Sequence, residues 1–135
     1  MAVETTFDFD MMLSSAREAY GEELMAIAGE GIDFAFVCSD NAPASCSAGK
    51  MMAKYPERCV NVGIAEQDEV GISTGLALSG KVVFAQVFGP FLPLRAADQI
   101  HTDAAYNDVN VRLIGTHSGV TSGGGPTHNV VADLA

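Results

Sequence analysis

The sequence predicts an α/β domain in which helices cover both faces of a parallel β-sheet. Three observations lead to this prediction. Segments with apolar residues at helical spacing alternate along the chain with short apolar segments. The short segments are apolar at nearly every position, which is typical of strands buried on both faces of a parallel sheet. Turn-forming residues follow them, so each strand can lead into the next helix through a right-handed crossover.

The first helix is expected at residues 10–28, where apolar side chains recur at helical spacing until Gly29 ends the pattern. Residues 34–37 are uniformly apolar and run into a Ser-Asp-Asn-Ala-Pro turn, which predicts a buried strand. A short helix is expected next at residues 47–55. It ends before Pro56, because proline lacks the amide that a helix needs to continue.

Residues 58–62 form the second predicted strand, and 65–79 the helix that follows it, which Gly80 closes. The third strand, 82–87, is almost entirely apolar. This order repeats the strand-then-helix pattern of the preceding segment, which favours a parallel sheet.

The last complete pair is a helix at 93–105 and a strand at 109–114. Residues 129–135 then begin what reads as another helix, with no strand or helix cap behind it. We therefore expect a domain that is truncated at its C-terminus, so that a further segment or a partner covers the exposed edge of the sheet.

The composition excludes several classes of function. Seventeen acidic residues against seven basic ones give a net charge of −10, which repels nucleic acid. No apolar run approaches the roughly 20 residues that cross a membrane, and the first residues do not form a secretion signal, so we expect a cytoplasmic protein. Cys38, Cys46 and Cys59 form no CxxC pair and predict reduced, mostly buried thiols. The length fits one domain, residues 1–135.

Residues capable of chemistry gather in the segments that follow the predicted strands. The carboxyl ends of parallel strands meet at one edge of a sheet, so these segments open on a shared rim. The side chains expected there are those of Asp40, Glu66, Phe88, Phe91, His117 and His128. The sequence therefore predicts a functional site on this rim.

Five segments, taken together and in order, resemble a known family. The central one is Asn61-Val62-Gly63-Ile64-Ala65-Glu66-Gln67, continued by the segment from Gly71 to Ala77. The others are Arg17-Glu18-Ala19-Tyr20-Gly21, the segment from Phe88 to Ile100, Gly115-Thr116-His117, and Gly125-Pro126-Thr127-His128. They resemble the pyrimidine-binding domain of transketolase and of deoxyxylulose-phosphate synthase. The resemblance implies a domain of a thiamine-diphosphate-dependent enzyme.

Glu66 has the central role in this resemblance. Considered alone, a glutamate in the first turn of a helix is explained by the helix dipole, which stabilises it by roughly 0.3–1 kcal/mol. The resemblance implies a bond from its carboxyl to a ring nitrogen of the cofactor's aminopyrimidine. That bond favours the imino tautomer, which deprotonates the thiazolium carbon. We therefore expect Glu66 to be catalytic, and Ile64 of the same motif to contact the cofactor.

Further cofactor contacts are implied from other loops. Phe88 and Phe91 stand on either side of a Gly-Pro pair and can border a flat heteroaromatic ring, although core packing explains most phenylalanines. Asp40 is placed like an aspartate that helps to fix the cofactor, and an Asx turn explains it equally well. A third position, often tyrosine in the family, is Leu94 here, which predicts an altered but still apolar pocket wall.

Three residues are expected to face the substrate. His117 and His128 match family residues that bind hydroxyls and assist proton transfer, whereas a lone loop histidine is usually solvated. Arg17 aligns with an arginine that binds the phosphate of the acceptor, and a solvated surface charge is the alternative. In the loop before His128, Gly124 replaces an acidic residue that contacts sugar hydroxyls. The substrate is therefore not fixed as a sugar phosphate.

The chain lacks the Gly-Asp-Gly motif that, with a later asparagine, holds Mg²⁺ and the diphosphate in this family. A large partner subunit is therefore expected to bind Mg²⁺ and the diphosphate of thiamine diphosphate, in a hetero-oligomer such as a heterotetramer. The leading hypothesis is the small subunit or a fragment of a split transketolase-like enzyme, for two-carbon ketol or acyl anion transfer. Two alternatives stay open: a beta-type subunit of a 2-oxo-acid dehydrogenase, and a non-catalytic transketolase-like binding module.

Overall fold

The computed structural model describes residues 16–40, 46–120 and 123–129 of the chain. Its strands are β1 (Phe34–Cys38), β2 (Cys59–Asn61), β3 (Val82–Phe88) and β4 (Val111–Thr116). Neighbouring strands are parallel throughout, in the order β2-β1-β3-β4. This topology confirms the parallel α/β fold that the alternating sequence pattern predicts.

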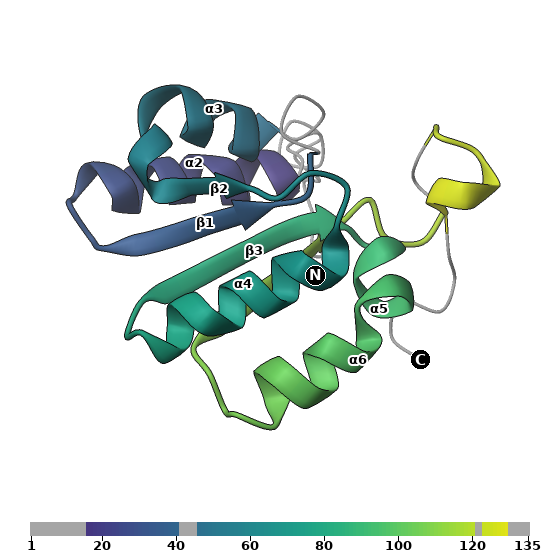
Figure 1. Cartoon of the computed structure of the whole chain (residues 1–135). Helices are drawn as coiled ribbons and strands as arrows, with labels where there is room; N and C mark the ends of the chain where they lie inside the picture. Colours follow the sequence, from purple (N-terminus) through teal and green to yellow (C-terminus); the bar gives the residue numbers. More distant parts are fainter. Residues whose placement is uncertain (1–15, 41–45, 121–122, 130–135) are drawn as a thin grey trace, which may run out of the picture.

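The helices are α2 (Ala16–Gly29), α3 (Cys46–Lys54), α4 (Glu66–Leu78), α5 (Phe91–Arg95) and α6 (Ala97–Gln99). Shorter turns are η1 (Pro56–Arg58) and η3 (Pro126–His128), and η2 (Ile100–Ala105) is a π-helix. Figure 1 shows α2 and α3 side by side on one face of the sheet, and α4 with α5 and α6 on the other. Helices therefore cover both faces, as predicted.

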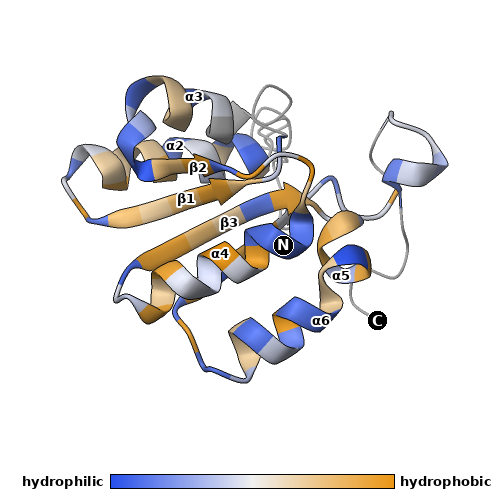
Figure 2. Ribbon diagram, viewed as in Figure 1, coloured by the Kyte–Doolittle hydropathy of each residue, from blue (hydrophilic) through white to orange (hydrophobic). Residues whose placement is uncertain are grey.

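Alternating side chains of the central strands build a core on each face of the sheet. All five residues of β1 are buried. Phe34 and Phe36 point to one side, where they pack with Leu24 of α2, and Ala35 and Val37 point to the side of α4. Figure 2 shows that β1 and β3 are hydrophobic along most of their length, which explains why the sequence pattern of these strands shows no polar alternation.

The predicted helix at 93–105 differs most from the structure. It is divided into α5, α6 and the π-helix η2. The backbone leaves helical geometry at Ala96, with φ −109° and ψ 16°, and the Ala96 side chain is fully buried against Val70 and Val87. Packing of this residue on the sheet interrupts the helix. Residues 10–15 of the first predicted helix, and 130–135 of the last, lie outside the described residues.

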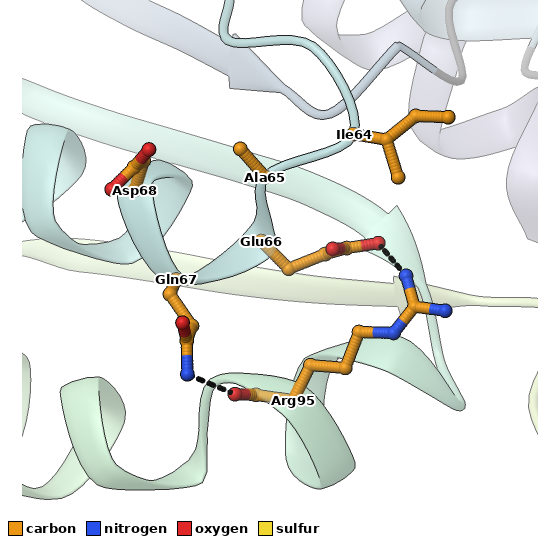
Figure 3. Close-up of a pocket in the computed structure, with 6 residues that line it drawn as sticks. All are labelled: Ile64, Ala65, Glu66, Gln67, Asp68 and Arg95. Carbon is orange, nitrogen blue, oxygen red and sulfur yellow. Dashed lines mark hydrogen bonds and ion pairs between the residues drawn. The ribbon is translucent and has the colours of Figure 1, made fainter.

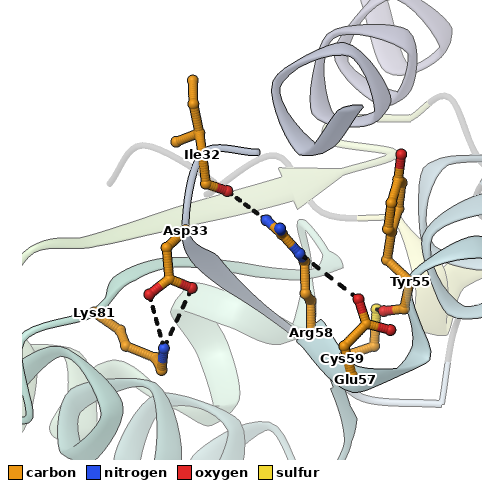
Figure 4. Close-up of polar contacts among 7 residues, drawn as sticks. All are labelled: Ile32, Asp33, Tyr55, Glu57, Arg58, Cys59 and Lys81. Atoms are coloured by element: carbon orange, nitrogen blue, oxygen red, sulfur yellow. Dashed lines mark hydrogen bonds and ion pairs between the residues drawn. The ribbon is translucent and has the colours of Figure 1, made fainter. Parts of the chain in front are cut away.

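Charged residues tie the strands together at their amino ends, away from the predicted rim. Lys81, just before β3, lies 3.0 Å from a carboxylate oxygen of Asp33, just before β1 (Figure 4). Arg58, just before β2, donates to the carbonyl of Ile32 and lies over the ring of Tyr55. These contacts hold the three strand starts in register, so that their other ends meet at the rim. Among the helices that the structure describes, none is long and apolar enough to span a membrane.

Candidate functional site

Asn61, at the end of β2, joins the loops that follow β1 and β2. Its Oδ1 accepts hydrogen bonds from the backbone amides of Asp40 and Gly63, at 2.9 and 3.0 Å. Its side-chain amide donates to Oδ1 of Asp40 at 3.2 Å. Asp40 has a φ of 49°, a conformation that aspartate adopts more readily than most residues. These bonds hold Asp40 in place at the rim of the sheet. Its contact with a cofactor stays a prediction.

Glu66 is the first residue of α4, and only 5% of it is exposed. Its Oε1 lies 2.8 Å from Nη1 of Arg95, at the end of α5 (Figure 3). Gln67 fixes the backbone of the same arginine, because its Nε2 donates to the Arg95 carbonyl at 3.1 Å. The start of α4 therefore presents a buried, ion-paired carboxylate to the rim.

The guanidinium of Arg95 also lies over an aromatic ring. Its Cζ is 4.0 Å from the ring centroid of Phe91. The Arg95 side chain is 47% exposed, so the cation sits at the open edge of the site. A guanidinium is planar, and it can stack on an aromatic face while its N–H groups donate within its own plane. Phe91 thus contacts the face of the flat Arg95 guanidinium, and the Glu66 carboxylate contacts its edge.

Four aromatic rings gather beyond the ends of β3 and β4. The ring centroid of Phe88 is 6.1 Å from that of Phe91, 4.5 Å from that of His117 and 6.0 Å from that of His128. His128 is 5.1 Å from Phe91. The rings meet tilted or edge-on, which are favourable arrangements for aromatic pairs. The structure therefore brings together both predicted phenylalanines and both predicted histidines.

A cavity of about 320 Å³ opens at this place. Its lining consists of Ser39, Asp40, Ile64, Glu66, Val87, Phe88, Phe91, Arg95 and His128. Its volume is at the lower end of the range for small-molecule sites, and its walls combine apolar side chains with a few polar groups. The five residues predicted to contact the cofactor are all in the lining, together with His128, whereas His117 is not. Ile64, 76% exposed, stands at the mouth.

Leu94 does not extend this apolar wall, contrary to the expectation from sequence. It is 62% exposed and lies outside the lining of the cavity. Leu92, two residues earlier on the same short helix, is buried in the core and turns Leu94 toward the surface.

Arg17 and His117 are 100 residues apart in the sequence and meet at the edge of the site, where Nη1 of Arg17 donates to Nε2 of His117. Because arginine only donates, Nε2 must carry the lone pair, and the proton of a neutral imidazole lies on Nδ1, 3.1 Å from Oγ1 of Thr116. Burial, and then the charge of Arg17, lower the pKa of His117. His117 is therefore neutral at pH 7, and Arg17 is not a solvated surface charge.

His128 packs closely against Gly124 in the loop that precedes it. A Cβ at position 124 would lie 2.7 Å from Cγ and 2.9 Å from Cβ of His128. The absence of a side chain at Gly124 therefore lets the His128 ring fold back onto Phe88 and Phe91. The glycine that departs from the family pattern thus has a structural consequence within the site.

Sequence reasoning missed one buried carboxyl. Glu69, one turn after Glu66 on α4, is fully buried, and its Oε2 accepts a hydrogen bond from Oγ of Ser39. Burial raises the pKa of Glu69 to about 7; the Ser39 bond opposes this shift and the charge of Glu66 adds to it. The spacing of three residues from Glu66 was the available signal, because it puts both carboxyls on one helix face.

Sequence reasoning also missed Asn61 and Arg95. Their roles arise from contacts between loops, which no local pattern announces. In the part of the chain that the structure describes, no three His, Cys, Asp or Glu side chains lie together as they would to hold a metal ion.

The comparisons with known proteins agree on one family. The family model of the transketolase pyrimidine-binding domain matches residues 14–135. A subunit of the apulose-4-phosphate transketolase of Phocaeicola vulgatus is 40% identical over 124 residues, which cover 90% of this chain and 39% of that protein. The subunit of the same name from Actinobacillus succinogenes is 38% identical over 114 residues, which cover 84% of this chain and 36% of that protein.

A solved structure described as a split gene transketolase, inactive beta4 tetramer, superimposes with a TM-score of 0.69 at 34% identity. The match covers 87% of this chain and 37% of that one. The chain thus spans less than half the length of the relatives that it matches. With a family model that matches from residue 14 to residue 135, and a fold and sequence shared with these relatives, the chain belongs to the transketolase pyrimidine-binding domain family.

Proposed function

We propose that this chain is the small subunit, or part of it, of a split transketolase-like enzyme, and that it binds the aminopyrimidine ring of thiamine diphosphate. The observation that carries the proposal is the environment of Arg95. A guanidinium is flat and offers N–H groups at its edge, and here Phe91 takes its face while Glu66 takes its edge. An aminopyrimidine is also flat and offers a ring nitrogen at its edge. The residues therefore fit the ring half of the cofactor.

Glu66 is the proposed catalytic residue. Thiamine diphosphate, when bound, supplies a thiazolium carbon that adds to the carbonyl of a ketol donor. The Glu66 carboxyl would share a proton with the ring nitrogen, in a place where water has little access because the residue is only 5% exposed. Phe88 and Phe91 would border the ring, with Ile64 and Asp40 at the edge of the same cavity.

The histidines and Arg17 are proposed to serve the substrate. His117 is neutral at pH 7 because burial and Arg17 lower its pKa, and it would accept a proton at Nε2 once Arg17 turns from that nitrogen to the substrate. The ring of His128 is part of the cavity lining and rests on Phe91, which places it beside the proposed cofactor ring. Arg17 would both orient His117 and offer a charge to an anionic group of the acceptor.

A large subunit is the proposed partner, in a cytoplasmic hetero-oligomer. Arg95 is the only cation among the residues that line the cavity, and it is paired with Glu66, so no free cation there neutralises a diphosphate. The large subunit would supply the diphosphate site and Mg²⁺. The names of the relatives support this division, since two are named as subunits of a transketolase and the similar structure is called a split gene transketolase.

Reconstitution tests the proposal. The chain is mixed with a large subunit, thiamine diphosphate and Mg²⁺, and ketol transfer is measured for the wild type, Glu66→Gln and Asp68→Asn. Glu66→Gln is expected to lose activity by about 10²–10⁴-fold while the complex still assembles. Asp68, exposed and two residues away, is the matched control and should change little. Full activity of the Glu66→Gln complex would show that the assigned mechanism is wrong.

The same mixture separates the alternatives. Oxidative turnover of a 2-oxo acid without ketol transfer would favour the beta-type dehydrogenase subunit, although the segment Gly125 to His128 argues against that assignment. If the wild-type chain forms no complex and supports no ketol transfer, the non-catalytic binding module is the better interpretation.

A further inference from the structure

Ser39 and Glu69 form a hydrogen-bonded pair at the wall of the cavity. Ser39 directly follows β1 and is one of the residues that line the cavity. Glu69 lies one helical turn after Glu66 on α4 and is fully buried. The hydroxyl of Ser39 donates to Oε2 of Glu69, so the bond joins the end of β1 to the start of α4. The proposed function gives this pair no role.

The chemistry of a carboxylate fixes the direction of this bond. An ionised carboxyl has no hydrogen to donate and can only accept. The single proton of the Ser39 hydroxyl is therefore used in the bond to Glu69, and the Ser39 oxygen can only accept from a further partner. A serine without such a neighbour can turn its hydroxyl and either donate or accept. Glu69 thus makes Ser39 an acceptor at the wall of the cavity.

The burial of Glu69 costs stability. Its Oε1 has no hydrogen-bond partner among the described residues, and the ion pairs within the described ranges involve other acidic residues. A buried carboxyl with one unbonded oxygen is less favourable than an apolar side chain of similar size at the same place. The unfavourable group lies in contact with a residue of the cavity lining, which points to a role in what the cavity binds.

We propose that Ser39 accepts a hydrogen bond from the exocyclic amino group of the aminopyrimidine ring, and that Glu69 is the positioning residue that holds Ser39 as an acceptor. This inference rests on the proposed function, in which Glu66 takes the ring nitrogen and Phe91 borders the ring. The amino group lies at another point of the same ring edge and is a hydrogen-bond donor. The pair therefore selects a ring with a donor at this point and disfavours one with an acceptor, because two acceptors would then face each other.

Two ring fragments test this selection without any activity assay. In 4-amino-2-methylpyrimidine the donor is present, and in 4-methoxy-2-methylpyrimidine an oxygen that only accepts takes its place. The affinity of the full chain for each is measured by NMR titration at pH 8. Burial raises the pKa of Glu69 to about 7, so the carboxyl is ionised at this pH. The wild type is expected to bind the amino fragment more tightly by roughly tenfold.

Glu69→Met separates a positioning role from a structural one. Methionine is apolar and suits a buried position, and Ser39 keeps its hydroxyl but loses the carboxylate that holds its proton. The hydroxyl can then donate into the cavity, so the methoxy fragment should bind several-fold more tightly than it does to the wild type. The preference for the amino fragment should fall accordingly. A structural role would weaken both fragments alike, and an unchanged preference in Glu69→Met overturns the proposal.

The double variant Ser39→Ala, Glu69→Met removes the hydroxyl as well. Both partners become apolar, so no buried carboxyl is left without its bond. The amino fragment should bind more weakly than in the wild type by roughly fivefold to tenfold, and the methoxy fragment more weakly than in Glu69→Met. Ser73→Ala is the matched control, because Ser73 is also buried on α4 but lies outside the cavity lining. If Glu69→Met fails to fold, the double variant carries the test, and a wild-type preference in it overturns the proposal.

The wild type alone distinguishes failure of this inference from failure of the proposed function. Tight and equal binding of both fragments would mean that the ring is bound without help from Ser39, which overturns the inference and leaves the proposed ring site in place. Binding of neither fragment would defeat the proposed ring site, and the role of Ser39 and Glu69 with it.

Discussion

Arg95 and Glu66 form an ion pair of 2.8 Å in the place where the cofactor ring is proposed to bind. The same guanidinium covers the face of Phe91, at 4.0 Å. Of the two partners, the carboxylate is buried and the arginine half exposed, so the arginine is the one that is free to move out. A ring that takes both contacts must therefore displace the Arg95 side chain from Phe91.

Removal of this side chain should strengthen binding of the ring. The probe is 4-amino-2-methylpyrimidine, a fragment that needs no diphosphate site, and its affinity for the chain is measured from NMR shifts of Phe91 and His128. Arg95→Met is expected to bind it several-fold more tightly, because no cation competes for Phe91 and Glu66. Arg112→Met is the matched control, since Arg112 lies over Phe84 at 5.6 Å, outside the cavity lining. Weaker binding by Arg95→Met would mean that Arg95 assists the ring.

Glu69 should make the stability of the chain depend on pH. Its folded pKa, about 7, lies above the ordinary 4.5, so between these values the folded state binds more protons than the unfolded state. Stability must then fall as the pH rises from about 4.5 to about 7, by on the order of 3 kcal/mol at most, and level off above. Urea unfolding at pH 5 and pH 8 measures this difference.

In Glu69→Gln the Glu69 contribution to that difference should vanish, because glutamine does not titrate. Asp68→Asn, which removes an exposed charge from the same helix turn, should retain it. An equally large decline between pH 5 and pH 8 in Glu69→Gln would assign the loss of stability to another group.

The sequence predicts the fold well because the apolar composition of the strands indicates directly that they are buried. β1 is apolar throughout and β3 at every position but Gln86, which predicts strands buried in a parallel sheet, whereas the order β2-β1-β3-β4 comes from the structure. The break at Ala96 had no such signal. An alanine is a good helix former, and its burial against Val70 and Val87 is a tertiary contact that local preference cannot anticipate.

The residues of the site likewise divide into those that the sequence predicts and those that it does not. Glu66 and Phe88 are expected on the rim because each comes after a predicted strand, and His128 because it ends the loop after the last strand. The structure puts all three in one cavity. The sequence pattern gives no sign of the roles of Arg95 and Glu69, because each depends on a partner from another segment: Glu66 on α4 for Arg95, and Ser39, just after β1, for Glu69. A residue whose role follows from its place after a strand is thus easier to predict than a residue whose role depends on a contact with another segment.

Arg17 should control the protonation of His117. Replacing Arg17 with Met removes the nearby positive charge, so the pKa of His117 should rise, although burial, the larger cause, will keep it below the ordinary value. Arg17→Lys retains the charge and should change the pKa less. Proton NMR titration of the imidazole measures both. An unchanged His117 titration in Arg17→Met would mean that the contact has no electrostatic effect.

The same relationship has a consequence for stability. A lowered folded pKa means that the folded state binds the His117 proton less well than the unfolded chain does. This contribution to stability is present above the ordinary pKa of histidine, about 6.5, and declines as the pH falls below it. The decline should be shallower in Arg17→Met.

Gly124→Ala should displace His128 from the aromatic cluster. The added Cβ would approach Cγ and Cβ of His128 to 2.7 and 2.9 Å, and these atoms, unlike the tip of a flexible side chain, cannot turn aside without moving the whole ring. NMR signals of the imidazole, shifted by Phe88 and Phe91, should then move toward the positions of an exposed histidine. Gly123→Ala is the matched control, because a Cβ there meets nothing within 4 Å. Equal signals in both variants would contradict the assigned packing.

The outcome for Gly124 bears on the substrate. Any side chain at this position, including the acidic one that the family pattern predicts, would occupy the space that the ring of His128 fills. An acidic side chain at position 124 is therefore incompatible with the present position of His128, edge-on to Phe91. Gly124→Asp should consequently move the imidazole as Gly124→Ala does, and in the reconstituted complex it should change the relative rates with different donors more than Gly123→Asp, which adds the same charge one residue away from the contact.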